Sequence, residues 1–181
     1  MQNSPGTTEL APRVEVARMR RRHLRSVMAI ERQVYPRPWS PSLFLAEMAD
    51  EHNRTYLVAK VGRELVGYAG MNCWGDEAHV TNIAVDPKWH RRRIGTRLLY
   101  ELIRSAQDMR ATAISLEVRV SNWGAQRLYS EFGLRPVGVR KNYYQEVNED
   151  ALIMWADGLQ TPEYLDRIED IIDSLPEGVR P

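Results

Sequence analysis

Three apolar segments follow one another between residues 55 and 86, and each is typical of a β-strand. They are TYLVAKV (55–61), LVGYAGMNCW (65–74) and EAHVTNIAVD (77–86). The gaps between them are long enough for tight turns and too short for a crossover helix. This stretch therefore predicts an antiparallel meander of three strands, against which the rest of the chain has to pack.

Helical and strand patterns precede the meander. Residues 13–19 alternate like a short strand, and apolar residues at helical spacing predict helices over 22–35 and 41–50. Ser40 is suited to cap the second helix, because a serine before Pro41 can accept a bond from a free backbone amide of the first turn. A strand and two helices are therefore expected before the meander.

Helices and strands alternate after the meander. The patterns predict a helix over 94–109, a strand over 112–120 and a helix over 122–133, which Asn122 caps. Two further strands, RPVGVRKNYYQEV and DALIMWADG, are expected to form a closing hairpin. The predicted order is β-α-α-β-β-β-α-β-α-β-β, which defines a mixed α/β domain.

The two ends of the chain differ from its middle. Residues 1–12 are polar and rich in glycine and proline, which predicts a disordered N-terminal tail. Residues 13–157 form the predicted domain. Residues 158–181 form an acidic C-terminal extension with an amphipathic helix, for which Thr161 and Pro162 provide a start. We expect its apolar stripe to pack on the domain, with docking of a partner as the alternative.

The charge distribution favours an anionic partner. The net charge is +1, but from Asp157 onward there are seven acidic and two basic residues, which leaves 23 basic and 17 acidic residues before it. A basic body of about +6 attracts anions. There is one cysteine, Cys73, so an internal disulfide is excluded. The four histidines show no ligand spacing, so no metal is expected. The N-terminus has no signal-peptide pattern and no apolar run suits a membrane, so we expect a cytoplasmic protein.

Three consecutive arginines at residues 91–93 lie between a strand and a helix. A helix N-terminus carries free amides and partial positive charge, and the arginines add to that potential. Charge alone leaves three interpretations: a solvated loop, a nucleic-acid surface shared with the basic run at 18–25, or a site for a small phosphorylated ligand. The strand that leads into the loop, together with Gly95, favours the third interpretation.

The segment NIAVDPKWHRRRIGTRLL (82–99) resembles the acetyl-CoA-binding motif of the GNAT acetyltransferases. The resemblance continues through LEVRVSNWGAQRLYSEFGLRPVGVRKNYY, EDALIMW and, upstream, IERQVYPRPWSPSLF, and it covers about residues 13–156. Together these segments look like the RimI branch, the ribosomal-protein-alanine N-acetyltransferases. The resemblance implies the GNAT fold, with a mixed, mostly antiparallel sheet flanked by helices. The C-terminal helix is then an addition to that fold.

The resemblance implies that acetyl-CoA is the cosubstrate. In the family, amides of the loop wrap the CoA pyrophosphate, the pantetheine arm pairs with the preceding strand, and an asparagine contacts CoA. An amide near Val85 would then stabilise the developing oxyanion. The implied cofactor-binding residues are Ile83, Ala84, Val85, Arg91, Arg92, Arg93, Ile94, Gly95, Thr96 and Asn122. Arg93 stands where the family usually has its first glycine, and a positive φ there would strain an arginine.

Two residues match the catalytic positions of the family. Glu117, in LEVR, matches the general base, and Tyr129, in RLYSEFG, matches the general acid that protonates the CoA sulfur. From the residues alone, Glu117 is equally interpreted as a surface carboxylate paired with Arg119. Tyr129 is likewise interpreted as a half-buried core tyrosine. Transfer to an amine needs a proton acceptor for the amine and a proton donor for the thiolate.

A third group of residues is expected to wall the acceptor pocket: Trp39, Ser40, Glu77, His79, Asn142, Tyr143 and Tyr144. Strand alternation predicts that Glu77 and His79 share a face with Thr81, Ile83 and Val85. By the same rule, only one of the two consecutive tyrosines faces the pocket. For His79, a structural histidine and a second base are both open interpretations.

The acceptor implied by the resemblance is the α-amino group of a protein N-terminus, with the N-terminal alanine of small-subunit ribosomal protein eighteen as the namesake substrate. A lysine ε-amine, or a small-molecule amine such as a polyamine or an aminoglycoside, is the alternative within the same fold. A basic RNA- or ribosome-binding module is the alternative of another class. No helix-turn-helix, zinc-finger or ribonucleoprotein pattern accompanies the basic runs, so direct nucleic-acid binding is not expected.

Overall fold

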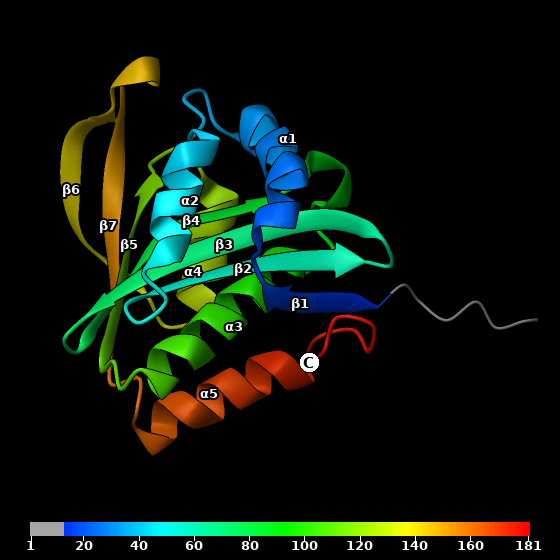
Figure 1. Cartoon of the computed structure of the whole chain (residues 1–181). Helices are drawn as coiled ribbons and strands as arrows, with labels where there is room; N and C mark the ends of the chain where they lie inside the picture. The colour runs from blue at the N-terminus through cyan, green and yellow to red at the C-terminus, as the bar shows by residue number, and fades with distance from the viewer. Residues whose placement is uncertain (1–12) are drawn as a thin grey trace, which may run out of the picture.

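The computed structural model describes residues 13–181, and the predicted N-terminal tail of residues 1–12 lies outside them. A seven-stranded sheet with the strand order β1-β2-β3-β4-β5-β7-β6 forms the centre of the molecule (Figure 1). The strands are β1 (Val14–Arg18), β2 (Arg54–Val61), β3 (Glu64–Trp74), β4 (Glu77–Val85), β5 (Ala113–Arg119), β6 (Arg135–Tyr144) and β7 (Glu149–Asp157). The helices are α1 (Leu24–Val34), α2 (Pro41–Ala49), α3 (Ile94–Asp108), α4 (Trp123–Glu131) and α5 (Pro162–Asp173), with 3₁₀ turns at Arg21–His23, Pro87–Trp89 and Gln145–Val147.

The predicted element order is confirmed, including the meander. Strands β1 to β4 pair antiparallel in sequence, and β7 pairs antiparallel with both β5 and β6. Strands β4 and β5 are parallel, because α3 crosses between them. Two antiparallel groups of strands therefore meet at one parallel pair in the middle of the sheet.

Helices cover both faces of the sheet. On one face, α1 and α2 pack on β2 to β4 around the aromatic side chains of Phe44, Tyr56 and Tyr68. On the other face, α3 and α4 bury apolar side chains such as Leu98 and Phe132 in a second, larger core. No helix within residues 13–181 has both the length and the apolar character needed to cross a bilayer.

Three side chains cap the helices at the predicted positions. Ser40 Oγ accepts a bond from the amide of Leu43 at 3.2 Å, and Pro41 occupies the first turn of α2. Asn122 Oδ1 caps α4 and Thr161 Oγ1 caps α5 in the same way. Each cap satisfies an amide that the helix leaves free. Because such residues are preferred at this position, the three helix starts could be predicted from the sequence.

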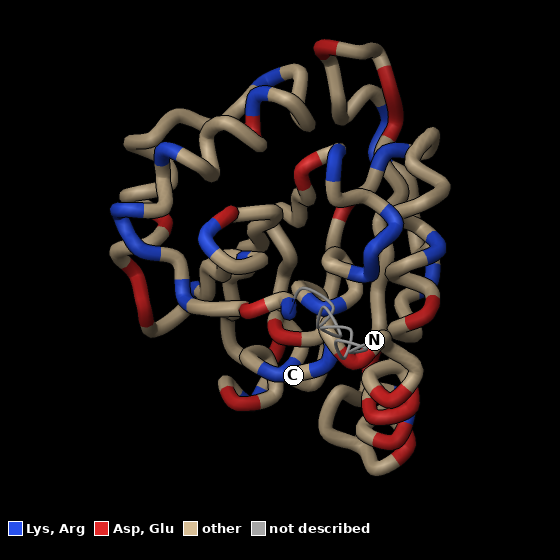
Figure 2. The backbone as a smooth tube through the Cα atoms, turned by 90° about the vertical axis from the view of Figure 1, so that its right-hand side faces the viewer, with Lys and Arg blue, Asp and Glu red and all other residues tan. Residues whose placement is uncertain are grey.

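The C-terminal segment packs on the sheet domain through α5. The Tyr164 hydroxyl donates to the carbonyl of Phe132 at 2.9 Å, and the buried Arg97 donates to the carbonyl of Val179 at 2.9 Å. The amide of Val14 in β1 bonds to the carbonyl of Gly178 at 2.7 Å. Helix α5 lies beside α3 (Figure 1), and its acidic side chains gather at the bottom of the molecule (Figure 2).

Candidate active site

A gap opens where β4 and β5 separate. The two strands pair only over residues 77–80 and 113–116, although β4 continues to Val85 and β5 to Arg119. On the open edge of β4, the carbonyl of Ile83 accepts a bond from the Tyr35 hydroxyl at 3.2 Å, and His90 Nε2 lies 3.0 Å from the carbonyl of Val85. Each of these carbonyls has one side-chain partner and a second lone pair, which an extended ligand can use.

A bulge in β4 changes which side chains face the gap. The register between β3 and β4 shifts at Thr81, which has no partner on β3. Beyond the bulge, Ile83 and Val85 pack against the core under α3, whereas His79 lies on the pocket side. The prediction that Glu77 and His79 share a face with Ile83 and Val85 is therefore wrong, because a bulge inserts one residue and breaks the alternation.

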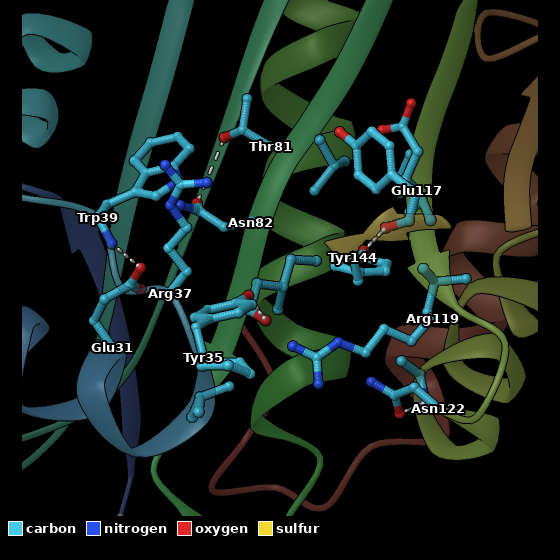
Figure 3. Close-up of a pocket in the computed structure, with 18 of the residues that line it drawn as sticks. Glu31, Tyr35, Arg37, Trp39, Thr81, Asn82, Glu117, Arg119, Asn122 and Tyr144 are labelled. Carbon is cyan, nitrogen blue, oxygen red and sulfur yellow. Dashed lines mark hydrogen bonds between the residues drawn. The ribbon is translucent and has the colours of Figure 1, made fainter. Parts of the chain in front are cut away.

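The gap leads into a pocket of about 760 Å³. Figure 3 shows Tyr35, Arg37 and Trp39 from the α1–α2 loop on one side, with Glu117 and Arg119 of β5 on the other. The N-terminal half of α4 and the end of β6 complete the wall. This volume suits a small-molecule or chain-end ligand, because such pockets usually measure about 300–1,000 Å³.

Five polar side chains, which we call the Glu117 network, form a continuous chain beside the pocket. Glu117 Oε1 lies 3.2 Å from Arg140 Nη2, and Glu117 Oε2 lies 3.1 Å from His79 Nε2. His79 Nδ1 lies 2.9 Å from Ser115 Oγ, and that hydroxyl donates to Glu77 Oε1 at 2.9 Å. The network joins β4, β5 and β6, because the parallel register places His79 directly opposite Ser115.

The network holds Glu117 as a carboxylate. The hydrogen bond from His79 lowers the pKa of Glu117, burial opposes that shift, and the positive charge of Arg140 adds to the lowering. The Glu117 side chain is 8% exposed, so its interaction with the two partners is only weakly screened by water. The alternative of a surface carboxylate paired with Arg119 is excluded, since its partners are His79 and Arg140.

Tyr129 lines the same pocket. It comes from α4 and is 8% exposed, with a hydroxyl that forms no hydrogen bond to residues 13–181. Burial, with a smaller contribution from Tyr144, raises its pKa, so the phenol keeps its proton at neutral pH. A buried, protonated and unpartnered hydroxyl in a pocket is available to donate to a ligand.

The three arginines at residues 91–93, which we call the arginine loop, have a strained backbone. Arg91 and Arg93 both adopt left-handed conformations, with φ angles of 60° and 61°. Arg93 is the N-cap of α3, and its side chain forms an ion pair with Glu131 of α4 at 2.8 Å. The positive φ that would strain an arginine at this position is present, and Arg93 occupies a conformation that favours glycine.

The loop also meets the requirements of an anion site. The first helical bond of α3 runs from the amide of Arg97 to the carbonyl of Arg93, so the three preceding amides have no acceptor within the helix. A Cβ atom added to Gly95 would lie 3.3 Å from Leu128 of α4, so the glycine allows the two helices to approach. These free amides, with three exposed arginines beside them, fit a pyrophosphate.

The structure brings most of the predicted pocket residues together. Those that line the pocket are Trp39, Ile83, Glu117, Asn122, Tyr129, His79, Tyr143 and Tyr144. Three other predicted wall residues, Ser40, Glu77 and Asn142, do not line it. Ser40 caps α2, and Glu77 ends the network away from the pocket. Among the predicted cofactor residues, Ala84 buries its side chain in the core under α1 and α2.

Both consecutive tyrosines line the pocket, so the prediction that only one does so is wrong. The pairing of β6 with β7 shifts between Arg140 and Tyr144, and Asn142 within this stretch has a left-handed φ of 50°. This irregularity breaks the strand alternation. The rings of Tyr143 and Tyr144 pack edge to face, with centroids 5.1 Å apart.

Sequence reasoning placed Trp39 in the pocket wall but missed Glu31, Tyr35 and Arg37, which come from α1 and the same loop. The buried Glu31 accepts a bond from the amide of Trp39 at 2.8 Å and another from the Tyr68 hydroxyl, and burial raises its pKa. Arg37 forms an ion pair at 3.3 Å with Glu146, which also lines the pocket. The two X-Pro steps predicted a loop here, but nothing in the segment indicated that it would approach β4.

Comparison with known proteins shows which family this chain resembles. The model of the acetyltransferase (GNAT) family matches residues 24–134. A Bacillus subtilis protein with the provisional name ribosomal protein bS18-alanine N-acetyltransferase is 39% identical over 140 residues, which are 77% of this chain and 93% of that protein. N-alpha-acetyltransferase RimI of Mycobacterium tuberculosis is 42% identical over 124 residues, which are 66% and 76% of the two chains.

A solved structure agrees with these sequence matches. The crystal structure of the ribosomal-protein-S18-alanine N-acetyltransferase from Escherichia coli superimposes with a TM-score of 0.74 at 28% identity. The alignment covers 83% of this chain and 97% of that one. The similarity therefore spans the sheet and the pocket. Among residues 13–181, no three His, Cys, Asp or Glu side chains are grouped as a metal site would require.

Proposed function

This chain belongs to the GNAT family of acetyltransferases, and from that premise we propose that it acetylates the α-amino group of a protein N-terminus. It is an acetyl-CoA-dependent N-acetyltransferase. The names of its relatives support the N-terminal alanine of ribosomal protein bS18 as the acceptor. The reaction then takes place in the cytoplasm, where ribosomal proteins are made.

The single observation that carries this proposal is the pocket between the separated strands. A buried carboxylate, Glu117, and a buried phenol, Tyr129, line the same cavity. Acyl transfer to an amine requires a proton acceptor on one side and a proton donor on the other. An RNA-binding module would need neither of these groups, so the pocket favours the enzyme.

The arginine loop supports the assignment of the cosubstrate, which when bound supplies the acetyl group as a thioester. The free amides of Ile94, Gly95 and Thr96, with the charges of Arg91 and Arg92, would hold the pyrophosphate. The backbone edge at Ile83–Val85 would hold the extended pantetheine arm, and Asn122 lines the same pocket. Arg93 contributes less, because Glu131 already pairs with its guanidinium.

Glu117 is assigned the role of proton acceptor. An α-ammonium group has a pKa of about 7.7–8.0, so at neutral pH most of the substrate has to lose one proton before it can attack. The carboxylate attracts the ammonium and accepts its proton, and the loss of that proton exposes the nitrogen lone pair. A lysine ε-ammonium, with a pKa of about 10.4, would be harder for the same base to deprotonate.

Tyr129 is assigned the role of proton donor. The departing thiolate is a better leaving group when it is protonated, and a neutral phenol in the same pocket supplies that proton. Burial keeps Tyr129 protonated, which suits a donor. The amide of Val85, on the open edge of β4, is assigned to stabilise the developing oxyanion.

A substitution of Glu117 tests the proposal. Purified wild-type enzyme is incubated with acetyl-CoA and a peptide that has an N-terminal alanine and no lysine, and thiol release is followed. Glu117→Gln should lower kcat by about 10²–10⁴, because one acid or base contributes that much. The control is Glu163→Gln on the exposed surface of α5, which removes a carboxylate away from the pocket. Unchanged turnover in Glu117→Gln would remove Glu117 from the mechanism.

A further inference from the structure

A cluster of basic side chains, which we call the basic edge, lies outside the pocket. It takes its members from three segments, 20–25, 60–64 and 86–88, which together contain seven basic and two acidic residues. Six of the seven basic residues are exposed, and Lys60 is half-buried. None of the seven forms an ion pair with another residue of the described chain, 13–181. The members are Arg20, Arg21, Arg22, Arg25, Lys60, Arg63 and Lys88.

The three segments are neighbours in space. The amide of Met19, just before the first segment, bonds to the carbonyl of Tyr56 in β2 at 2.8 Å. Lys60 lies further along β2, which turns into β3 at the right-hand edge of the molecule in Figure 1. Glu64, at the start of β3, accepts a bond at 3.1 Å from Trp89 Nε1, in the 3₁₀ turn that overlaps the third segment. These contacts bring the seven cations to one edge of the molecule.

The surroundings of His23 show that the first two segments share one electrostatic field. Burial lowers the pKa of His23 the most, and the positive charges of Arg22, Lys60 and Arg20 lower it further. Lys60 belongs to β2, so its charge acts on the first segment from a different element. Like charges held close together repel one another, and an anion that binds between them relieves this repulsion.

The carboxylates nearby do not neutralise the basic edge. Glu64 is engaged by a tryptophan N–H, and Asp86 Oδ1 accepts a bond from the amide of Lys88 at 2.9 Å. Glu15 lies across from Lys60 on β1. Seven cations against these three carboxylates leave a net charge of +4. The basic edge therefore has positive charge that is free to attract an anionic partner.

The composition of the basic edge favours the phosphates of a nucleic acid. Five of the seven cations are arginines, and a guanidinium binds a phosphate through two parallel hydrogen bonds. The large hydrophobic side chains that are exposed elsewhere in residues 13–181, such as Trp74 and Trp123, do not occur in the three segments. A protein interface would have an apolar or aromatic centre, and a membrane-surface site would have apolar side chains beside the basic ones. Charge without an apolar centre suits a phosphate backbone.

We propose that the basic edge binds the phosphate backbone of RNA while the pocket acts on a protein acceptor. The choice of RNA rests on the proposed function, in which the acceptor is a ribosomal protein, whereas the surface itself is separate from the pocket. Contacts with phosphates position a protein without reading bases, so they require no sequence-specific recognition motif. The basic edge gives the enzyme a second point of attachment to an acceptor that is bound to RNA.

Helix α1 joins the basic edge to the pocket. Its first residue, Leu24, lies within the first basic segment, and its last residue, Val34, lines the pocket. The 11 residues of this helix span about 16 Å, at about 1.5 Å per residue. An extended chain covers that distance with about five residues. An acceptor therefore needs an N-terminal stretch of at least about five residues beyond its contact with RNA to reach the pocket.

The test is the binding of a short, fluorescently labelled RNA duplex of mixed sequence, measured by anisotropy at several salt concentrations. Saturating CoA is present throughout, so that the arginine loop is already occupied. The wild type should bind with a Kd of about 1–100 µM near physiological salt, as contacts with phosphates alone usually do. Arg21→Glu combined with Arg25→Glu should weaken binding by about tenfold or more. It should also lower the slope of log affinity against log salt by about 2, because each phosphate contact contributes roughly 0.7–0.9.

Two further variants locate the site. Arg63→Glu, in the turn between β2 and β3, should also weaken RNA binding several-fold, because the proposal places both segments on the same RNA. Arg104→Glu combined with Arg127→Glu reverses two exposed charges on α3 and α4 and is the matched control. The control should keep the wild-type affinity for RNA. If it lost as much affinity as the Arg21 and Arg25 variant, positive charge in general would bind the RNA and the proposal would be overturned.

Other anionic probes test the choice of partner. Duplex DNA of the same sequence, polyglutamate and vesicles that contain phosphatidylserine replace the RNA in the same assay. RNA should bind at least as tightly as each of them. Tighter binding of DNA, of the acidic peptide or of the vesicles would overturn the assignment to RNA.

Acetylation of a free peptide distinguishes this inference from the proposed function. Without RNA, Arg21→Glu combined with Arg25→Glu should keep the wild-type kcat and KM for a peptide with an N-terminal alanine, because neither arginine lines the pocket. A wild type that acetylates this peptide but shows no salt-dependent binding of RNA would overturn the inference and leave the function intact. A wild type that binds RNA through the basic edge but acetylates no amine would overturn the proposed function instead.

Discussion

The arginine loop and the Glu117 network are two charged regions of this molecule that are built in opposite ways. In the loop, Arg91, Arg92 and Arg93 are exposed, and the one ion pair joins Arg93 to Glu131. In the network, every charged group has a partner from another position on the sheet. The charges of the loop are therefore available to a ligand, whereas the charges of the network are paired with one another.

This difference assigns binding to one region and reaction rate to the other. Exposed charges beside free helix amides attract an anion, and their effect is screened by salt. Mutually paired groups add little attraction for a distant ligand, but around the buried Glu117 they hold a carboxylate in a fixed position and protonation state. Substitutions in the loop should therefore change CoA affinity, and substitutions at the pocket walls should change kcat.

The largest effect is expected at Tyr129. Tyr129→Phe removes the hydroxyl and keeps the ring that packs in the core, so the fold and CoA binding should persist. We expect kcat to fall by about 10²–10⁴, because the thiolate would leave without a proton donor. Tyr100→Phe, a partly buried tyrosine on α3 outside the pocket, is the control. A wild-type kcat for Tyr129→Phe would show that Tyr129 lines the pocket without acting as the proton donor.

A smaller effect is expected from reversing charge in the loop. Arg91→Glu combined with Arg92→Glu should weaken CoA binding by roughly tenfold, as two exposed charge contacts become repulsive. It should also flatten the dependence of CoA affinity on salt, while kcat at saturating acetyl-CoA stays close to the wild type. Calorimetric titration at two salt concentrations measures this.

The matched control for the loop reverses two charges elsewhere. Arg25 and Arg32 are exposed on α1, so Arg25→Glu with Arg32→Glu changes the net charge equally. If this control weakened CoA binding as much as the loop variant, the whole body of the protein, and not the loop, would attract the anion.

The smallest effect concerns the stability of the loop. Arg91→Gly should raise the free energy of unfolding by about 1 kcal/mol, because glycine adopts a positive φ without the steric cost of a side chain. Arg93→Gly should gain less, since it also loses the ion pair with Glu131. Urea unfolding without CoA measures both. A lower free energy of unfolding for Arg91→Gly would show that contacts of the Arg91 side chain stabilise the loop by more than its backbone conformation costs.

The sequence predicted the loop and failed to predict the network, for one physical reason. The loop is continuous along the chain, so its strand, proline turn, arginines and helix start are all visible together. The network takes its members from β4, β5 and β6, and two registers have to be known before Glu117, His79 and Arg140 can be placed together.

The order of elements and the helix starts could be predicted because local patterns determine them, as at Ser40 and Asn122. The bulges could not be predicted. Neither Thr81 nor Asn142 is a glycine or a proline, and pairing with the neighbouring strand determines where the extra residue is placed. The wrong face assignments on β4 and at Tyr143 and Tyr144 follow from these two bulges.

The central claim is that the pocket acetylates an α-amine, and two peptides test it most directly. One has a free N-terminal alanine and no lysine, and the other has a blocked N-terminus and a single lysine. Thiol release from acetyl-CoA is measured with each peptide at neutral pH. We predict release with the first peptide alone, because the lower pKa of an α-amine suits a carboxylate base. Release with the second peptide alone, or with neither, would contradict the claim.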